Sequence, residues 1–298
     1  MLNTRFTAIF ALPALSSTLF RPQANQWAPT LTIVDEQLDT IAGWLRDARF
    51  VMVLTGAGIS TESGIPDFRG PQGLWTKNPA AEKTANLEYY MGDPEIRRRA
   101  WQNRVNSEMW TAEPNAAHRA LVALERLQRL HALVTQNVDG LHHAAGQSAE
   151  IMVEIHGNVR EAKCMTCDWH GPMAETLDRV REGEDDPRCI HCGGILKSAT
   201  ISFGENLVPT DLERSQRWAA RTDVFCAIGT SLAVYPAAGL PEIALRAGAR
   251  LVVMNAEETP FDPVADAVVR DRLGEVLPAL VERVESGAGT VGNNRLVE

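Results

Sequence analysis

Short runs of apolar residues alternate with amphipathic segments along most of the chain, and each run ends in polar or glycine residues. These continuous runs predict buried β-strands at residues 50–55, 133–135, 151–155, 224–228 and 251–254. Apolar residues at helical spacing predict a helix over residues 116–130, and residues 241–247 form another candidate helix. The alternation predicts an α/β fold with a doubly wound parallel sheet, whose ligands are expected beyond the carboxyl ends of the strands.

Two segments interrupt this pattern. Residues 160–200 are polar and acidic and are interpreted as a small inserted module, while residues 76–113, rich in arginine and aromatic residues, form a second helical or irregular insertion. We expect a folded domain over residues 31–285, a disordered extension over residues 1–30 and a flexible, glycine-rich tail over residues 286–298. A weak signal peptide at residues 6–20 is the alternative for the extension, although Pro13 interrupts its apolar stretch.

Composition narrows the class of protein. The chain has 298 residues, 45% hydrophobic and 22% charged, which is ordinary globular usage. No apolar run reaches the roughly 18 residues of a transmembrane helix, so no membrane association is expected. The net charge of −9 disfavours nucleic acid as a partner and suits a partner that carries lysines.

Four of the five cysteines form two C-x-x-C pairs, Cys164/Cys167 and Cys189/Cys192. This spacing predicts a tetrahedral zinc site of the zinc-ribbon kind, and four thiolates leave no open position for chemistry at the metal. Two redox pairs are the alternative, but the expected thioredoxin-like β–α context is missing. Cys226 lies within an apolar run and is interpreted as a buried side chain, and the odd cysteine count favours a reducing cytoplasm.

A glycine-rich turn at residues 55–60 follows the first predicted strand directly. Glycines let the backbone approach an anion, whose charge meets free N–H groups at the start of a helix. Because the usual third glycine falls at Thr61, a simple tight turn remains the alternative. Residues 61–70 then bring an acid, an aromatic ring and an arginine close to this turn, a combination that suits a ribose and a pyrophosphate.

The motifs taken together resemble those of the sirtuin family, NAD-dependent protein-lysine deacylases, of bacterial type. The matching blocks are Gly56-Ala57-Gly58-Ile59-Ser60 with Gly64-Ile65-Pro66-Asp67-Phe68-Arg69, Thr135-Gln136-Asn137-Val138-Asp139-Gly140-Leu141-His142, His156-Gly157-Asn158, the cysteine pairs, Phe203-Gly204-Glu205, Gly229-Thr230-Ser231-Leu232 and Val253-Met254-Asn255. They extend over residues 41–284. The resemblance implies a Rossmann-like domain with a small zinc domain.

The resemblance also implies residue roles. Those implied to bind NAD are Gly56, Ala57, Gly58, Ser60, Thr61, Asp67, Phe68, Arg69, Gln136, Asn137, Asp139, Gly229, Thr230, Ser231, Asn255, Ala256 and Glu257. Within this set, Gln136, Asn137 and Asp139 would line the nicotinamide pocket. An acyl-lysine peptide would pair as an added strand between Phe203, Gly204 and Glu205 on one side and Val234 and Tyr235 on the other.

The implied chemistry uses NAD as a reactant, because the chain has no nucleophile elbow and no open metal position. In the family mechanism the acyl-lysine oxygen attacks the ribose carbon that bears nicotinamide. His156 then acts as general base toward the ribose hydroxyls, and Asn137 is assigned to the catalytic group with it. Histidine suits this task because its ordinary pKa of about 6.5 lies near the working pH.

Several alternatives stay open. His156 could merely cap a strand end, and Asp139 could be a helix cap. The whole chain could be a mono-ADP-ribosyltransferase with the same NAD pocket, or a non-catalytic zinc-ribbon binding module. Family members that prefer succinyl or malonyl groups carry a Tyr and, three residues on, an Arg. Here Trp101 stands where the Tyr would be, with Arg104 after it, so an acetyl or longer apolar acyl group is expected.

Overall fold

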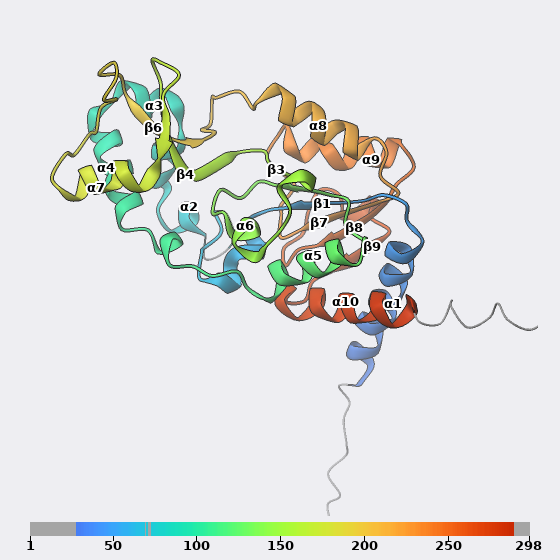
Figure 1. Cartoon of the computed structure of the whole chain (residues 1–298). Helices are drawn as coiled ribbons and strands as arrows, with labels where there is room; N and C mark the ends of the chain where they lie inside the picture. Colours follow the sequence, from blue (N-terminus) through green and yellow to red (C-terminus); the bar gives the residue numbers. More distant parts are fainter. Residues whose placement is uncertain (1–27, 69, 71–72, 289–298) are drawn as a thin grey trace, which may run out of the picture.

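The structure is a computed structural model that describes residues 28–68, 70 and 73–288 (Figure 1). Within these residues, six parallel strands form a large sheet in the spatial order β3-β2-β1-β7-β8-β9. The strands are β1 (Val51–Thr55), β2 (Ala132–Thr135), β3 (Met152–Glu154), β7 (Val224–Ile228), β8 (Arg250–Met254) and β9 (Ala267–Val269). The strand order reverses between β1 and β7, and the carboxyl ends of these two strands are therefore where a ligand is expected.

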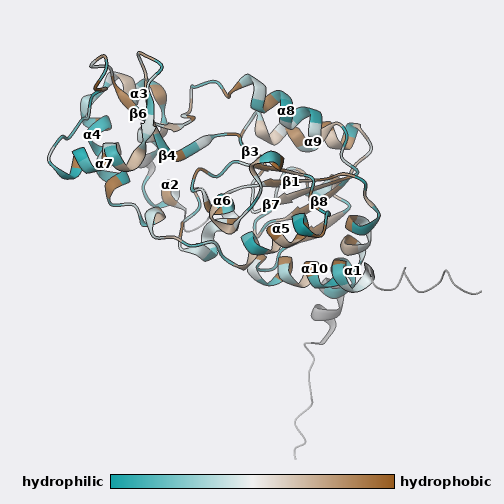
Figure 2. Ribbon diagram, viewed as in Figure 1, coloured by the Kyte–Doolittle hydropathy of each residue, from teal (hydrophilic) through white to brown (hydrophobic). Residues whose placement is uncertain are grey.

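Helices cover both faces of this sheet, as Figure 1 shows. On one face lie α1 (Ala28–Asp47), α5 (Ala116–Arg126) and α10 (Leu273–Ala288), and on the other lie α8 (Pro209–Ala219) and α9 (Leu240–Arg246). Side chains of β1 alternate between the two layers: Val51 and Val53 join one core, and Met52 and Leu54 join the other. Apolar residues accordingly concentrate on the central strands (Figure 2). The predicted doubly wound α/β fold is confirmed.

The small domain is built from both insertions. An antiparallel sheet in the order β5-β4-β6 comes from the second insertion, with α7 beside it. Its elements are β4 (Gly157–Cys164), β5 (His170–Pro172), α7 (Met173–Arg181) and β6 (Leu196–Thr200), and the first insertion adds α2 (Leu74–Lys77), α3 (Leu87–Gly92) and α4 (Pro94–Val105).

One core joins these two insertions. Trp101 of α4 is fully buried in the same cluster as Met173, Leu177 and Leu196. Arg97 of α4 donates from Nε and Nη2 to the Asp186 carboxylate at 2.9–3.0 Å. The two insertions are therefore one unit of packing, although residues 114–159 separate them along the chain.

Short helices complete the description. They are η1 (Ala57–Ser63), η2 (Pro79–Ala85), η3 (Glu108–Trp110), α6 (Leu141–Ala145), η4 (Ala149–Ile151), η5 (Ala237–Gly239) and η6 (Asp262–Val264). None of the described helices is long and apolar enough to cross a membrane.

The expected ends of the folded domain need correction. Helix α10 runs through residues 286–288, so the tail does not begin at Ser286 as expected. The apolar stripe of this helix, including Leu277, Leu280 and Val284, packs on the same core as α1 and α5, and this packing outweighs the glycine-rich local composition. Likewise α1 begins at Ala28, so residues 28–30 belong to a helix rather than to the extension. Residues 1–27 and 289–298 lie outside the described residues.

Candidate active site

The glycine-rich turn after β1 packs directly on the turn after β7. The Gly56 N–H donates to the Ile228 carbonyl at 3.0 Å, and the Gly58 N–H donates to the Gly229 carbonyl at 2.8 Å. A Cβ at Gly56 would lie 2.7 Å from the Gly229 oxygen, and a Cβ at Gly58 would lie 2.8 Å from the Gly229 Cα. The glycines are required because the two main chains touch, and the shared surface lies at the switch point of the sheet.

The segment after β2 connects these two turns through side chains. Gln136 Nε2 donates to Thr230 Oγ1 at 2.8 Å. Asn137, which is buried, donates from Nδ2 to the Gly56 carbonyl at 3.1 Å and to Ser60 Oγ at 3.2 Å. The residues predicted for the nicotinamide pocket therefore lie together with both glycine turns, at the carboxyl ends of three adjacent strands.

Asp139 has two hydrogen-bonding roles. Its Oδ2 accepts from Ser60 Oγ at 2.7 Å, and its Oδ1 accepts from the Leu141 N–H at 2.9 Å, at the start of α6. Burial raises the pKa of this carboxyl, and the bonds from Leu141 and Ser60 together with the Arg160 charge act in the opposite direction. The helix-cap alternative thus describes one oxygen of Asp139, while the other belongs to the network of the first turn.

His156 lies just past the end of β3, with Nδ1 3.1 Å from the Gln136 carbonyl oxygen. A carbonyl only accepts, so Nδ1 carries the proton and Nε2 carries the lone pair of the neutral ring. Burial lowers the pKa of His156, and the bond to Gln136 opposes that shift. Among the described residues no group hydrogen-bonds Nε2. The side chain is consequently a neutral base with its free nitrogen fixed by the segment that carries Gln136 and Asn137.

The adjacent His142 and His143 diverge, as expected. His142 is buried and its Nε2 lies 3.0 Å from Thr55 Oγ1, whereas His143 is exposed and lies 3.7 Å from Glu154. Neither ring is hydrogen-bonded to the network of Gln136 and Asn137.

The remaining residues assigned to NAD lie in the segments that follow β1, β7 and β8. Thr61 and Ser231 are exposed, Asp67 accepts from the Gly70 N–H at 2.8 Å, and Phe68 is 39% exposed. Arg69 lies outside the described residues. After β8, Asn255 Nδ2 donates to the Glu257 carbonyl at 2.8 Å across the exposed Ala256.

Of the residues assigned to the substrate, Phe203, Gly204 and Glu205 follow β6 of the small domain, whereas Val234 and Tyr235 follow β7 of the large domain. The Phe203 N–H donates to the Ala85 carbonyl and its carbonyl accepts from the Leu87 N–H, both at 2.9 Å. The main chain of Phe203 is therefore already paired with the first insertion. Gly204 is exposed with φ 85°, and Tyr235, beyond the half-buried Val234, is 64% exposed with its hydroxyl 3.3 Å from Glu242.

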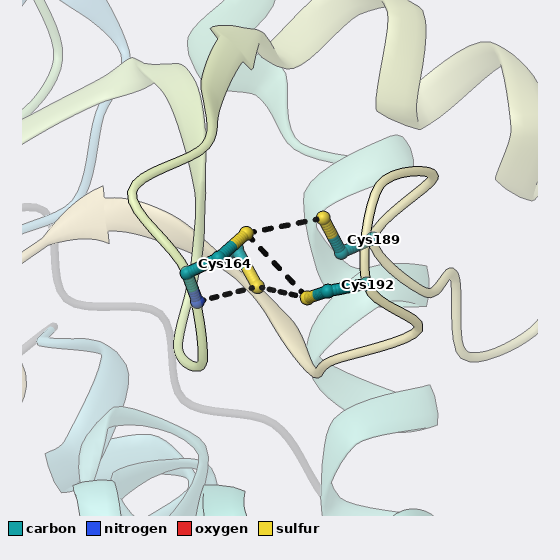
Figure 3. A group of neighbouring side chains, drawn as sticks. Cys164, Cys189 and Cys192 are labelled. Carbon is teal, nitrogen blue, oxygen red and sulfur yellow. Dashed lines mark hydrogen bonds between the residues drawn. The ribbon is translucent and has the colours of Figure 1, made fainter.

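The four cysteines of the two pairs gather at the end of β4 and in the loop before β6. Their sulfur atoms all lie within 4.8 Å of one another (Figure 3). Four sulfurs around a zinc ion at about 2.3 Å would stand roughly 3.8 Å apart, and the Cys167–Cys189 separation is 3.8 Å. The Thr166 and Gly194 N–H groups also donate to Cys164 Sγ and Cys192 Sγ at 3.3 and 3.4 Å, which suits thiolates. The expected gathering is confirmed, and the donor set fits a structural zinc ion.

Comparison with known proteins agrees with this arrangement. The sequence model described as "Sir2 family" matches residues 56–236. The chain belongs to the Sir2 family. The NAD-dependent protein deacetylase 2 of Streptomyces coelicolor is 55% identical over 231 residues, which is 78% of this chain and 96% of that protein. The NAD-dependent protein deacylase of Thermococcus kodakarensis is 41% identical over 244 residues, 81% of this chain and 93% of that protein.

Solved structures resemble this Sir2-family protein over nearly their full length. A Sir2 variant with a deacetylated p53 peptide and 3′-O-acetyl ADP-ribose is 34% identical, with a TM-score of 0.77 over 83% of this chain and 98% of that one. A second Sir2 enzyme structure is 38% identical with a TM-score of 0.77, covering 85% of this chain and 99% of that one.

Sequence reasoning missed two polar groups behind the site of this Sir2-family protein. Asn115 caps α5 and donates from Nδ2 to the Ile59 carbonyl of η1 at 2.8 Å. His118, one turn into α5, packs edge-on against His142 with ring centroids 4.9 Å apart. The Asn-x-x-His pattern at the start of a predicted helix was the available signal, because it can form a capping box.

Arg270 was also missed. Its Nη1 donates to the carbonyls of Asn255 and Glu257 at 2.7 and 3.0 Å, and its Nη2 pairs with Asp262. The arginine therefore fixes the turn after β8 of the Sir2-family fold. Its only sequence signal was its place after the short apolar run at residues 267–269.

Proposed function

We propose that this chain is an NAD-dependent protein-lysine deacylase, in the first place a deacetylase, which transfers the acyl group to ADP-ribose and releases nicotinamide and free lysine. The names of the relatives from Streptomyces coelicolor and Thermococcus kodakarensis support the reaction class. The observation that carries the proposal within this chain is His156: a half-buried, neutral imidazole whose protonated Nδ1 is fixed by the Gln136 carbonyl at 3.1 Å.

The residues at the switch point fit NAD. The glycines bring the turns after β1 and β7 into main-chain contact at the carboxyl ends of these strands, where a parallel sheet of this kind binds nucleotides. When bound, NAD supplies an electrophilic ribose carbon and a nicotinamide leaving group. Asn137, Ser60 and Asp139 form a connected network beside the first turn, and this network orients the nicotinamide end.

His156 supplies the proton transfer. With Nδ1 donating to Gln136, its Nε2 accepts a proton from a ribose hydroxyl. A pKa below the ordinary histidine value keeps the ring unprotonated at neutral pH, so the base is present without prior deprotonation. The four cysteines hold a zinc ion that stabilises the small domain and takes no part in the reaction.

The substrate is an acylated lysine in a protein. The peptide complex of a related Sir2 enzyme supports a peptide ligand. Since the main chain of Phe203 is already paired, the peptide runs past Gly204 and the segment of Val234 and Tyr235. A net charge of −9 suits lysine-bearing partners over nucleic acid, and we place the protein in the cytoplasm on its reduced cysteines.

An uncharged acyl group fits the small domain best. Trp101, which replaces the Tyr of succinyl-preferring family members, is fully buried in the core of the small domain. Arg104 donates from Nη2 to Ser198 Oγ at 3.0 Å and lies over the Trp101 ring. Its Nη1 is buried without a hydrogen-bond partner among the described residues, so it is the replacement of the Tyr by Trp101 that leads us to propose acetyl or a longer apolar chain as the acyl group.

Mass spectrometry of the products from NAD with acetyl-, propionyl-, succinyl- and long-chain acyl-lysine peptides tests the proposal. Acyl-ADP-ribose and free lysine peptide are the expected products, with the succinyl peptide the poorest substrate. Consumption of NAD without any acylated peptide would instead indicate mono-ADP-ribosyl transfer. If none of the peptides leads to release of nicotinamide, the chain would instead be a non-catalytic zinc-binding module.

A further inference from the structure

Lys197 in β6 is a lysine with no exposed surface. Lysines are almost never fully buried unless their charge is paired. Its Nζ donates to the carbonyls of Ser198, at 3.2 Å, and of Thr200, and it forms an ion pair with Glu205 Oε2 at 3.1 Å. All three N–H bonds of the ammonium group are therefore used, and all three acceptors lie within residues 198–205.

The Glu205 carboxylate is directed inward to this ammonium group. Its Oε1 accepts from Lys163 of β4, and its Oε2 also accepts from the Ser202 N–H at 3.1 Å. Residues 198–205 thus wrap around a buried pair of opposite charges. Glu205, which the family resemblance assigned to the substrate, therefore has both carboxylate oxygens bonded to groups within the protein.

The same segment contacts the candidate base. The Ile201 N–H donates to the His156 carbonyl at 2.7 Å, and Phe203 is paired on both sides with the first insertion. Beyond β6 the segment has no regular secondary structure, so these few bonds and the buried charge pair determine its path. A shift of the segment would move the main chain of His156 and the border along which the peptide is proposed to lie.

We propose that Lys197 and Glu205 are positioning residues, whose buried ion pair fixes residues 198–205 and thereby sets the acyl-lysine against His156. This role rests on the proposed function. This positioning role differs from direct contact with the substrate, because both charged groups are already bonded within the protein and neither can bind a peptide.

The test compares Lys197→Met with a matched control, Arg97→Met. Arg97 and Asp186 form another buried ion pair of the small domain, with side chains 4% and 12% exposed, and their other hydrogen bonds go to Tyr90, Met91 and Arg188, outside residues 198–205. In Lys197→Met we expect the KM for acetyl peptide to rise roughly tenfold and kcat to fall, with the Kd for NAD nearly unchanged. Arg97→Met should lower Tm without this change in KM. Equal increases in the peptide KM for the two variants at matched loss of Tm would overturn the proposal.

Glu205→Gln provides a second variant if Lys197→Met does not fold, because the amide keeps the shape of the carboxylate. It should raise the peptide KM in the same way. The double variant Lys197→Met/Glu205→Gln should be no worse than Glu205→Gln alone, because it removes the fully buried ammonium group and leaves only Lys163, whose side chain is 21% exposed, without its carboxylate partner. Additive losses in the double variant would count against a shared role.

Hydrogen exchange separates this inference from the proposed function. The amides of Ile201, Ser202 and Phe203 should exchange at least about tenfold faster in Lys197→Met and at wild-type rates in Arg97→Met. Unchanged exchange in Lys197→Met refutes the positioning role even if the wild-type protein is an active deacylase. Conversely, a wild-type protein that deacylates no peptide refutes the proposed function, while the exchange result still reports on the ion pair.

Discussion

The buried pair of His118 and His142 should make this protein sensitive to mild acid. The two side chains are 0% and 2% exposed, and His118 Nε2 and His142 Nδ1 are buried without a hydrogen-bond partner among the described residues. Burial lowers the pKa of His118 to about 4 and that of His142 to about 3. The folded state therefore keeps both rings neutral, whereas the unfolded chain protonates them near pH 6.5.

The size of the effect follows from proton linkage. Because the pKa values in the folded state are depressed, stability is fully present above pH 6.5 and is lost as the pH falls. Below pH 6.5 each histidine lowers the free energy of unfolding by about 1.4 kcal/mol per pH unit, until the pH reaches its pKa in the folded state. Between pH 7 and pH 4.5 the pair together should remove about 5 kcal/mol, a large part of the stability of an ordinary domain.

Urea unfolding at stepwise pH values measures this loss. His118→Gln/His142→Gln keeps polar groups near Asn115 and Thr55 but cannot take up protons, so its stability should fall less steeply below pH 6.5. His170→Gln, which alters an exposed histidine of the small domain, should retain the wild-type slope. Acid effects on carboxylates and on the cysteine site are common to all three proteins. Parallel pH profiles for wild type and the double variant would refute the reasoning.

Three further predictions concern the site and the metal. His156→Ala should abolish most deacylation while NAD still binds in calorimetry, because the base acts after the cofactor has bound; full turnover by this variant would exclude His156 as the base. Elemental analysis should find one zinc ion per chain, and a strong chelator should lower Tm and remove activity; folded, reduced protein without zinc would contradict this. Gly58→Ala should cost about 1–3 kcal/mol and raise the KM for NAD, because the new Cβ lies 2.8 Å from Gly229. Gly43→Ala, in α1 with its nearest neighbour at 3.8 Å, should be tolerated in urea unfolding, and equal losses in the two glycine variants would contradict the packing argument.

The pattern of apolar and polar residues predicted the strands of the large domain well, and the reason is physical. Strands β1, β2 and β7 are buried on both faces, so their sequences are continuous apolar runs that are visible without any tertiary information. The three-residue strand β9 was not predicted. The predicted helix over residues 116–130 ends at Arg126, and Gln128 takes φ 57°, a turn geometry that apolar spacing does not encode.

Contacts between distant segments were harder to predict. The joining of α4 to the zinc-binding insertion depends on Trp101 and on Arg97, whose partners lie far along the chain. The inward direction of Glu205 likewise depends on Lys197, and neither residue has a local signature of burial. The motifs located the chemistry, and the tertiary contacts decided which side chains can meet a ligand.

The division of the small domain into two insertions also has a consequence for synthesis on the ribosome. The chain emerges from its N-terminus, so α4 with Trp101 appears well before α7 and β6, which later cover it. During that interval a large aromatic face has no native partner. The turn after β7 appears later still, and the Gly58–Gly229 contact can form only then. Nascent chains that stop before β7 should therefore lack the cofactor site even when the zinc-binding module is complete.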